Sequence, residues 1–166
     1  LGNSGWSYED VLPYFKRSEN NEVFALQRHH DRLDRSLTGL GLPVADRDRL
    51  AEGIAAVLTE PLEFGRIRYS VTAGPGPLGS DRGDAEPTYI VLAGPVPRPA
   101  ETTAIATVPW TRNENSAVVG LKTTSYAENV VALAHAKERG GSEAIFVNTR
   151  GELCEGTGSN IFVVVD

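Results

Sequence analysis

The sequence predicts an α/β protein with a small α+β lobe over residues 24–110, followed by a second lobe over residues 111–166. Apolar residues recur at helical spacing before residue 61 and again over residues 125–139, which is typical of amphipathic helices. Other segments alternate apolar and polar residues or form short apolar runs bounded by turn residues, which indicates strands. The composition becomes polar around Trp110–Asn115, where we place the boundary between the lobes.

The composition excludes several classes of protein. The 166 residues include 16 lysines and arginines against 22 aspartates and glutamates, and this net charge of −6 argues against nucleic acid as a partner. Apolar runs such as Ile161–Val165 are too short to span a membrane. The single cysteine, Cys154, excludes an internal disulfide and is expected to be a small buried residue. With no signal peptide at its start, the chain is predicted to be cytoplasmic.

Three helices are expected in the first 60 residues. The first spans Ser7–Glu19, with Ser7 as its N-cap. The second spans Gln27–Leu37, and the third spans Asp46–Glu60 with Asp46 as its N-cap. Each of the last two carries an apolar stripe on one face. The stripe residues are Leu26, His30, Leu33 and Leu37 in the second helix, and Leu50, Ile54, Val57 and Leu58 in the third.

Strands and one further helix follow. The helix is expected over Ser125–Arg139, and it begins with a possible capping box between Ser125 and Glu128. Residues 73–87 contain the string G-P-G-P-L-G, which matches a dinucleotide-binding pattern in letters only. Its two prolines remove backbone N–H donors, so we interpret this segment as a surface loop. The expected strands are Arg66–Thr72, Thr88–Ala93, Thr103–Val108, Glu143–Asn148, Leu153 and Asn160–Val165.

Lysine is scarce, so each lysine can be considered individually. Lys16 and Lys137 lie on polar ends of expected helices. Lys122 follows the apolar stretch 117–121 and precedes a helix, a position typical of a strand or loop end that faces a cavity. A lysine amine becomes a Schiff-base nucleophile when desolvation lowers its pKa. The alternative interpretation is an ordinary solvated surface charge.

Glu155 is the second candidate. It begins the small-residue segment Glu155–Asn160, where glycines let the backbone approach a ligand closely and two hydroxyls are available. A carboxylate in such a place can keep a pyridinium nitrogen protonated, as pyridoxal phosphate chemistry requires. The alternative is a glycine turn with an exposed glutamate. The spacing of His29, His30 and His135 does not predict a metal site.

Together, these segments resemble the class IV aminotransferase family, whose members are fold type IV pyridoxal phosphate enzymes. The motifs that carry the resemblance are Arg112-Asn113, Gly120-Leu121-Lys122 and Glu155–Phe162. The resemblance covers about residues 24–166 and is strongest to 4-amino-4-deoxychorismate lyase-like members. It implies a two-lobed fold type IV architecture that is truncated at both ends in this chain.

The resemblance also implies roles for individual residues. Lys122 carries the internal aldimine and shuttles the proton between the substrate Cα and the cofactor C4′. Glu155 pairs with the pyridine nitrogen, and Arg32 binds the cofactor phosphate with its planar guanidinium. Arg68 lies on the strand that binds the substrate carboxylate in branched-chain members. The other residues expected to contact the cofactor are Tyr126, Thr157, Gly158 and Ser159.

The expected function is pyridoxal phosphate-dependent lyase or aminotransferase chemistry on a small amino acid-type substrate, in a homodimer. Aminodeoxychorismate lyase activity is one alternative, and branched-chain or D-amino acid transamination is another. Lys122 and Glu155 serve both reactions, so they do not separate them. An inactive fragment is a further alternative, because the family's N-terminal strands and the segment that completes its phosphate site are absent from the resemblance.

A second resemblance covers about residues 2–22. The string Gly5–Glu19 is similar to a segment of the glucose–methanol–choline flavin oxidoreductases. It includes neither that family's FAD glycine motif nor its catalytic histidines, so it implies no flavin function. We therefore expect residues 1–23 to be a foreign N-terminal helical segment.

Overall fold

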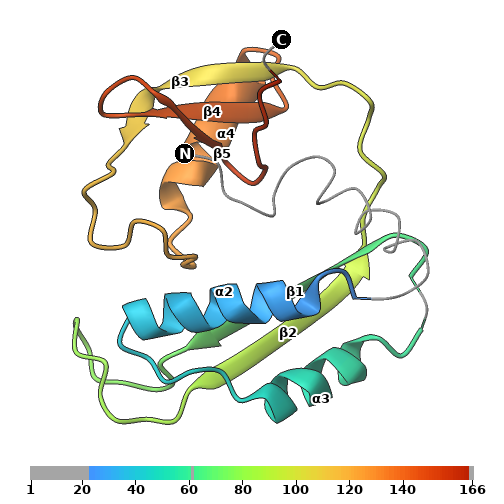
Figure 1. Ribbon diagram of the computed structural model, residues 1–166, viewed down its shortest axis with the longest axis vertical. Helices are drawn as coiled ribbons and strands as arrows, with labels where there is room; N and C mark the ends of the chain where they lie inside the picture. The colour runs from blue at the N-terminus through green and yellow to red at the C-terminus, as the bar shows by residue number, and fades with distance from the viewer. Residues whose placement is uncertain (1–22, 61, 165–166) are drawn as a thin grey trace. The chain divides into compact units, whose positions relative to one another are not determined.

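The computed structural model describes residues 23–60 and 62–164, and it divides the chain into two compact units, Leu1–Arg98 and Pro99–Asp166 (Figure 1). The predicted helix Ser7–Glu19 lies outside the described residues. The lobe boundaries at 23/24 and 110/111 stay predictions. In the described part of the chain, no helix has the length and apolar character needed to cross a lipid bilayer.

In the described residues of the first unit, the chain forms two helices and an antiparallel hairpin. The strands pair from Gly65 opposite Pro95 to Thr72 opposite Thr88, as their alternating sequences predict. The string G-P-G-P-L-G lies in the loop that joins the two strands, as expected. The elements are α2 (Leu26–Gly39), α3 (Arg47–Val57), β1 (Gly65–Thr72) and β2 (Thr88–Pro95).

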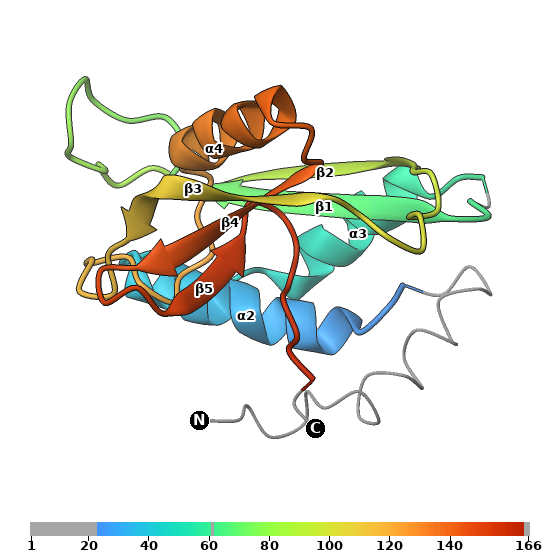
Figure 2. The ribbon, with the colours of Figure 1, turned by 90° about the horizontal axis from the view of Figure 1, so that it is seen from above.

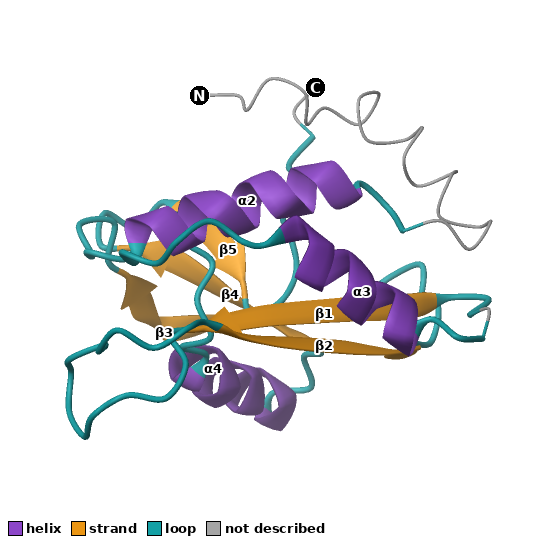
Figure 3. Cartoon of the chain, turned by 90° about the horizontal axis from the view of Figure 1, so that it is seen from below, coloured by secondary structure: helices purple, strands orange, loops and turns teal. Residues whose placement is uncertain are grey.

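Both helices cover the same face of the hairpin (Figure 3). Leu37 and Leu50 form the buried core of this unit with Ala45, and they pack against Tyr69 and other residues from one face of the strands. The helix α3 approaches β2 so closely that a Cβ at Gly53 would lie 2.6 Å from the Val91 Cγ2 atom. Leu33, Leu37 and Leu50 of the predicted stripes therefore pack in this core, whereas Leu58 lies just beyond the end of α3.

The start of α3 confirms the predicted N-cap. The Asp46 carboxylate accepts hydrogen bonds from the backbone N–H groups of Asp48 and Arg49 at 3.0 and 3.1 Å. The Asp46 N–H in turn donates to the Tyr89 hydroxyl at 2.9 Å, which ties this helix end to β2. The cap thus fixes both where α3 begins and where it sits on the hairpin.

The second unit is a three-stranded sheet with one helix on its face (Figure 2). The strand order is β3-β4-β5, in which β3 and β4 are parallel and β4 and β5 are antiparallel. The helix α4 provides the crossover that two parallel strands require. Its core consists of Val108, Ala132, Ala136, Ala144 and Phe146. The elements are β3 (Ile105–Arg112), α4 (Ala127–Glu138), β4 (Glu143–Asn148) and β5 (Leu153–Gly156).

Three expectations for this unit are wrong. The helix α4 begins at Ala127 with Tyr126 as its N-cap residue, so Ser125 lies one residue too early, no side chain caps the helix, and Glu128 pairs with Arg112. The expected strand Asn160–Val165 is absent from its described residues, 160–164, which have no neighbouring strand to pair with in the described part of the chain. Cys154 is exposed, because it lies on the short strand β5 at the edge of the sheet.

The core of the first unit gives a stability prediction. Leu50 is fully buried, whereas Val44 on the preceding loop is 62% exposed. We expect Leu50→Ala to lower the free energy of unfolding by about 2–5 kcal/mol, because it removes apolar contacts and leaves a cavity. Val44→Ala should change it by less than about 0.5 kcal/mol. Urea denaturation followed by circular dichroism measures both, and equal effects of the two substitutions would contradict this packing.

Candidate functional site

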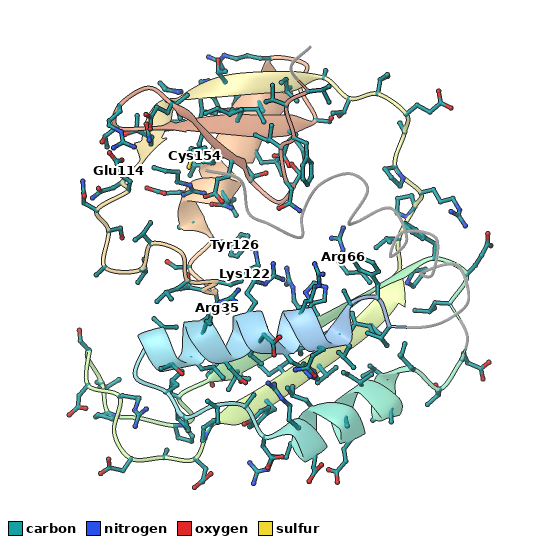
Figure 4. All side chains as sticks on the ribbon, viewed as in Figure 1. Arg35, Arg66, Glu114, Lys122, Tyr126 and Cys154 are labelled. Carbon is teal, nitrogen blue, oxygen red and sulfur yellow. The ribbon has the colours of Figure 1, made fainter. Side chains whose placement is uncertain are left out.

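The N-terminal end of α4 positions two of the predicted site residues. Tyr126 is the N-cap residue of α4, and Lys122 lies in the loop that precedes it (Figure 4). The Lys122 Nζ donates a hydrogen bond of 2.5 Å to the Tyr126 hydroxyl and lies 5.2 Å from the centre of its ring. Gly120 has φ of 75°, a conformation that favours glycine, and so directs the chain into this loop. The phenol therefore holds the amine in a defined position.

The surroundings of Lys122 differ from the sequence expectation. The sequence predicts that Lys122 faces a cavity after an apolar stretch, yet Val118 and Val119 of that stretch are 45% and 58% exposed. Lys122 itself is exposed as well. The described residues of its own unit, 99–164, therefore leave the amine exposed.

Arg112, the last residue of β3, connects α4 to β5. Its side chain is 19% exposed, and it donates hydrogen bonds to Glu128 and Asn129 on the first turn of α4. Its Nε lies 2.8 Å from the Glu155 Oε1, which is an ion pair, although the N–H is not aligned for a hydrogen bond. The guanidinium carbon also lies 3.9 Å from the centre of the Phe146 ring, a cation–π contact. Arg112 therefore places the Glu155 carboxylate close to the start of α4.

The turn that follows Glu155 is held from two sides. On one side, the Asn129 Nδ2 donates to the backbone oxygen of Thr157 at 2.5 Å. On the other side, the Glu143 carboxylate accepts hydrogen bonds from the Thr157 N–H at 3.0 Å, from the Thr157 hydroxyl and from the Ser159 hydroxyl at 2.7 Å. Thr157 is 8% exposed. The small-residue segment is thus an ordered turn with a buried centre.

The pKa of Glu143 is lowered from its ordinary value. Burial acts to raise the pKa, but the hydrogen bonds from Thr157, Ser159 and the Ala144 N–H favour the ionised form and outweigh it. Glu143 is therefore a carboxylate whose charge is stabilised by the turn it holds.

The structure places the predicted site residues in both units. Arg32 lies on α2, where its Nη2 is 3.0 Å from the His29 Nδ1, and it is exposed. Arg68 lies on β1 and is also exposed, on the face of the hairpin away from α2 and α3. The residues of the second unit are Lys122, Tyr126, Glu155, Thr157, Gly158 and Ser159.

Sequence reasoning did not identify Arg112, Asn129 and Glu143 as residues that organise this site. For Arg112, the sequence indicates only its place in the motif Arg112-Asn113. The available signal for Glu143 was its position as a single acidic residue at the start of an apolar strand, since such a charge needs hydrogen-bond partners when the strand is buried. Nothing local in the sequence singles out Asn129.

The chain belongs to the class IV aminotransferase family. The family model described as amino-transferase class IV matches residues 15–166. The mixed α/β fold agrees with solved structures of this family. One is a branched-chain aminotransferase from the archaeon Thermoproteus uzoniensis, with norvaline; the TM-score is 0.74 and the identity 27%, over 84% of this chain and 49% of that one.

Curated relatives carry several activity names. A Methanocaldococcus jannaschii protein, provisionally named a branched-chain-amino-acid aminotransferase, is 30% identical over 96% of this chain and 58% of its own length. A bifunctional aminodeoxychorismate lyase and D-amino acid transaminase of Mycobacterium tuberculosis is 26% identical over 85% of this chain and 52% of its own length. The chain thus spans about half the length of the curated relatives it matches.

The comparisons do not support the flavin oxidoreductase resemblance of residues 2–22. The class IV family model already begins at residue 15, inside that segment, and the Methanocaldococcus jannaschii relative aligns over 96% of the chain. The segment itself lies outside the described residues.

The lowered pKa of Glu143 predicts how stability depends on pH. Because the folded-state pKa lies below the unfolded value near 4.5, the unfolded state binds more protons as the pH falls past that value. The stabilisation by Glu143 is therefore present above this pH and is lost as the pH falls through the folded-state pKa. We expect Glu143→Gln to flatten this acid loss of unfolding free energy in urea titrations at several pH values. Glu138→Gln, which changes a side chain that is 75% exposed, is the control, and equal pH dependence in both variants would refute the prediction.

Proposed function

We propose that this chain carries part of a pyridoxal phosphate-dependent lyase or aminotransferase site that acts on a small amino acid-type substrate. The observation that carries the proposal is that the Lys122 amine and the Glu155 carboxylate are both linked to the N-terminal end of α4. Lys122 is hydrogen-bonded to Tyr126, the N-cap of α4, and Glu155 is paired with Arg112, which is bound to the first turn of α4. Membership of the class IV aminotransferase family supports this chemistry.

The residues present fit pyridoxal phosphate. The cofactor presents an aldehyde and a ring nitrogen, and the second unit offers an amine, Lys122, and a carboxylate, Glu155, as their partners. An ionised carboxylate accepts hydrogen bonds at two oxygens. Within the described residues, the Arg112 ion pair involves the Oε1 atom of Glu155, and the side chain remains 53% exposed. Glu155 can therefore bind a protonated ring nitrogen while Arg112 holds it in place.

Each residue has a distinct task in the proposed mechanism. Bound pyridoxal phosphate supplies an electron sink for the bond that breaks at the substrate Cα. Glu155 would hold the protonated ring nitrogen, and Lys122 Nζ would hold the cofactor through its aldehyde carbon. Once the substrate amine has displaced it there, the freed Lys122 amine would take the proton from the substrate Cα. The Tyr126 hydroxyl positions that amine. By the family resemblance, we assign the cofactor phosphate to Arg32 and the substrate carboxylate to Arg68.

The type of reaction depends on where the electrons go after the proton leaves the substrate Cα. Lys122 would deliver the proton to the cofactor in transamination, whereas in the lyase reaction a pyruvate unit would leave the substrate instead. We propose the lyase-like branch, to which the motifs around Arg112 and Lys122 are most similar. The Mycobacterium tuberculosis relative, whose name includes both activities, shows that the alternatives are closely related. The homodimer and the cytoplasmic location stay predictions.

Covalent labelling tests the proposed amine. The chain is incubated with pyridoxal phosphate, reduced with borohydride and digested, and the labelled peptide is mapped by mass spectrometry. We expect the label on Lys122, because Tyr126 positions this amine, and its loss in Lys122→Met. Lys137, an exposed lysine on α4, is the internal control. A label on Lys137 alone, or none at all, would contradict the proposal and favour an inactive fragment. Release of pyruvate from aminodeoxychorismate, measured on the same material, separates the lyase from a transaminase.

A further inference from the structure

We infer that Glu143 is a positioning residue of the proposed cofactor site: it holds the turn 155–159 in the shape that presents the Glu155 carboxylate to a ligand. The inference rests on the proposed function, because Glu155 matters only if it binds the cofactor ring. Glu143 acts through its neighbours, because it hydrogen-bonds Thr157 and Ser159, two of the residues that we expect to contact the cofactor.

In the described part of the chain, the hydrogen bonds that the Glu143 carboxylate accepts come from this turn or from the next residue of its own strand. One oxygen, Oε1, accepts from the Thr157 N–H, the Thr157 hydroxyl and the Ala144 N–H, and the other, Oε2, accepts from the Ser159 hydroxyl at 2.7 Å. The donors in the turn are two residues apart, so the carboxylate closes a loop around Gly158. Bonds to a charged acceptor are stronger than neutral ones, which makes this contact stiffer than an ordinary turn.

The backbone of the turn lies in close contact with the Glu143 carboxylate at Gly156. A Cβ at Gly156 would lie 2.5 Å from the Ser159 Oγ and 3.3 Å from the Glu143 carboxylate. The backbone therefore passes directly beside Glu143, with no room for a side chain between them. Because this contact begins one residue after Glu155, a shift of the turn moves the Glu155 backbone with it.

Glu155 is held from its other side by the sheet and by Arg112. It pairs with Phe146 in the register of β4 and β5, and the register shifts directly after this pair. The Arg112 Nε lies 2.8 Å from its carboxylate, and Asn129 binds the Thr157 backbone oxygen. Glu143 binds the turn from the opposite side, through Thr157 and Ser159. Without its carboxylate, the contacts of Arg112 and Asn129 act on the turn from one side only.

The chain offers a matched control for this interaction. Glu114 accepts hydrogen bonds from the Thr149 N–H at 3.2 Å and from the Thr149 hydroxyl at 2.7 Å. These are the same two kinds of donor group that Thr157 offers to Glu143, but they belong to a different turn. Glu114→Gln therefore removes a comparable carboxylate–threonine contact without touching the turn 155–159. A general loss of local order affects both variants, whereas a positioning role affects only Glu143→Gln.

The first measurement is amide hydrogen exchange of the chain without cofactor. We expect Glu143→Gln to speed exchange at the Thr157 N–H by about tenfold or more, because its charged acceptor is lost. In Glu114→Gln the increase should appear at Thr149 and not at Thr157. Ser159→Ala, which removes one of the hydrogen bonds and preserves the charge, should give a smaller increase and remains informative if Glu143→Gln folds poorly. If the exchange rate of the Thr157 N–H is unchanged in Glu143→Gln and in Ser159→Ala, the inference is overturned.

The second measurement uses the chain loaded with pyridoxal phosphate. The pH midpoint of the cofactor's ring-nitrogen titration, followed by absorbance, should fall in Glu143→Gln, because a displaced Glu155 stabilises the protonated ring less. Glu143→Asp should restore part of the shift, and Glu114→Gln should match the wild type. Faster exchange at Thr157 with an unchanged midpoint would show a purely structural role and overturn the inference. Failure of the proposed function is distinguishable, because it appears as a wild-type chain without a borohydride label on Lys122.

Discussion

The arrangement of α4, β3 and β5 in the second unit depends on one largely buried guanidinium, that of Arg112. Arg112 is 19% exposed and stacked on Phe146, so its charge must be compensated by nearby acceptors, and Glu128, Asn129 and Glu155 supply them from two different elements. This requirement fixes the first turn of α4 against the end of β3 and against β5. Glu128, which the sequence pairs with Ser125 in a capping box, is bound to Arg112 instead.

The same requirement gives the turn 155–159 its two-sided support. Arg112 and Asn129 hold it from the helix, and Glu143 holds it from the start of β4. A turn made of Gly156, Thr157 and Gly158 would otherwise be among the most flexible parts of the chain. Catalysis benefits from groups that are fixed before the ligand arrives, since no reorganisation is then needed during the reaction. The contacts of Arg112, Asn129 and Glu143 thus order a glycine-containing turn and position the Glu155 carboxylate beside it.

Local interactions account for what the sequence predicts well. The Asp46 cap, the stripes of α2 and α3 and the alternation of β1 and β2 each arise from residues close together in the chain, and each is confirmed. The failures come from distant partners: Glu128 is drawn to a residue sixteen positions away, and residues 160–164 lack a neighbouring strand in the described part of the chain. The pairings of Arg112 and Glu143 depend on the folded sheet, so the candidate residues could be named from sequence, but the network that holds Glu155 could not.

The central claim is that Glu155, held by this network, keeps the ring nitrogen of bound pyridoxal phosphate protonated. The most direct test is ¹⁵N NMR of the chain loaded with cofactor labelled at the ring nitrogen, recorded at neutral pH for the wild type and for Glu155→Gln. The account predicts the chemical shift of a protonated ring nitrogen in the wild type and that of a neutral nitrogen in the variant. A neutral nitrogen in the wild type, or the same shift in both proteins, would contradict it.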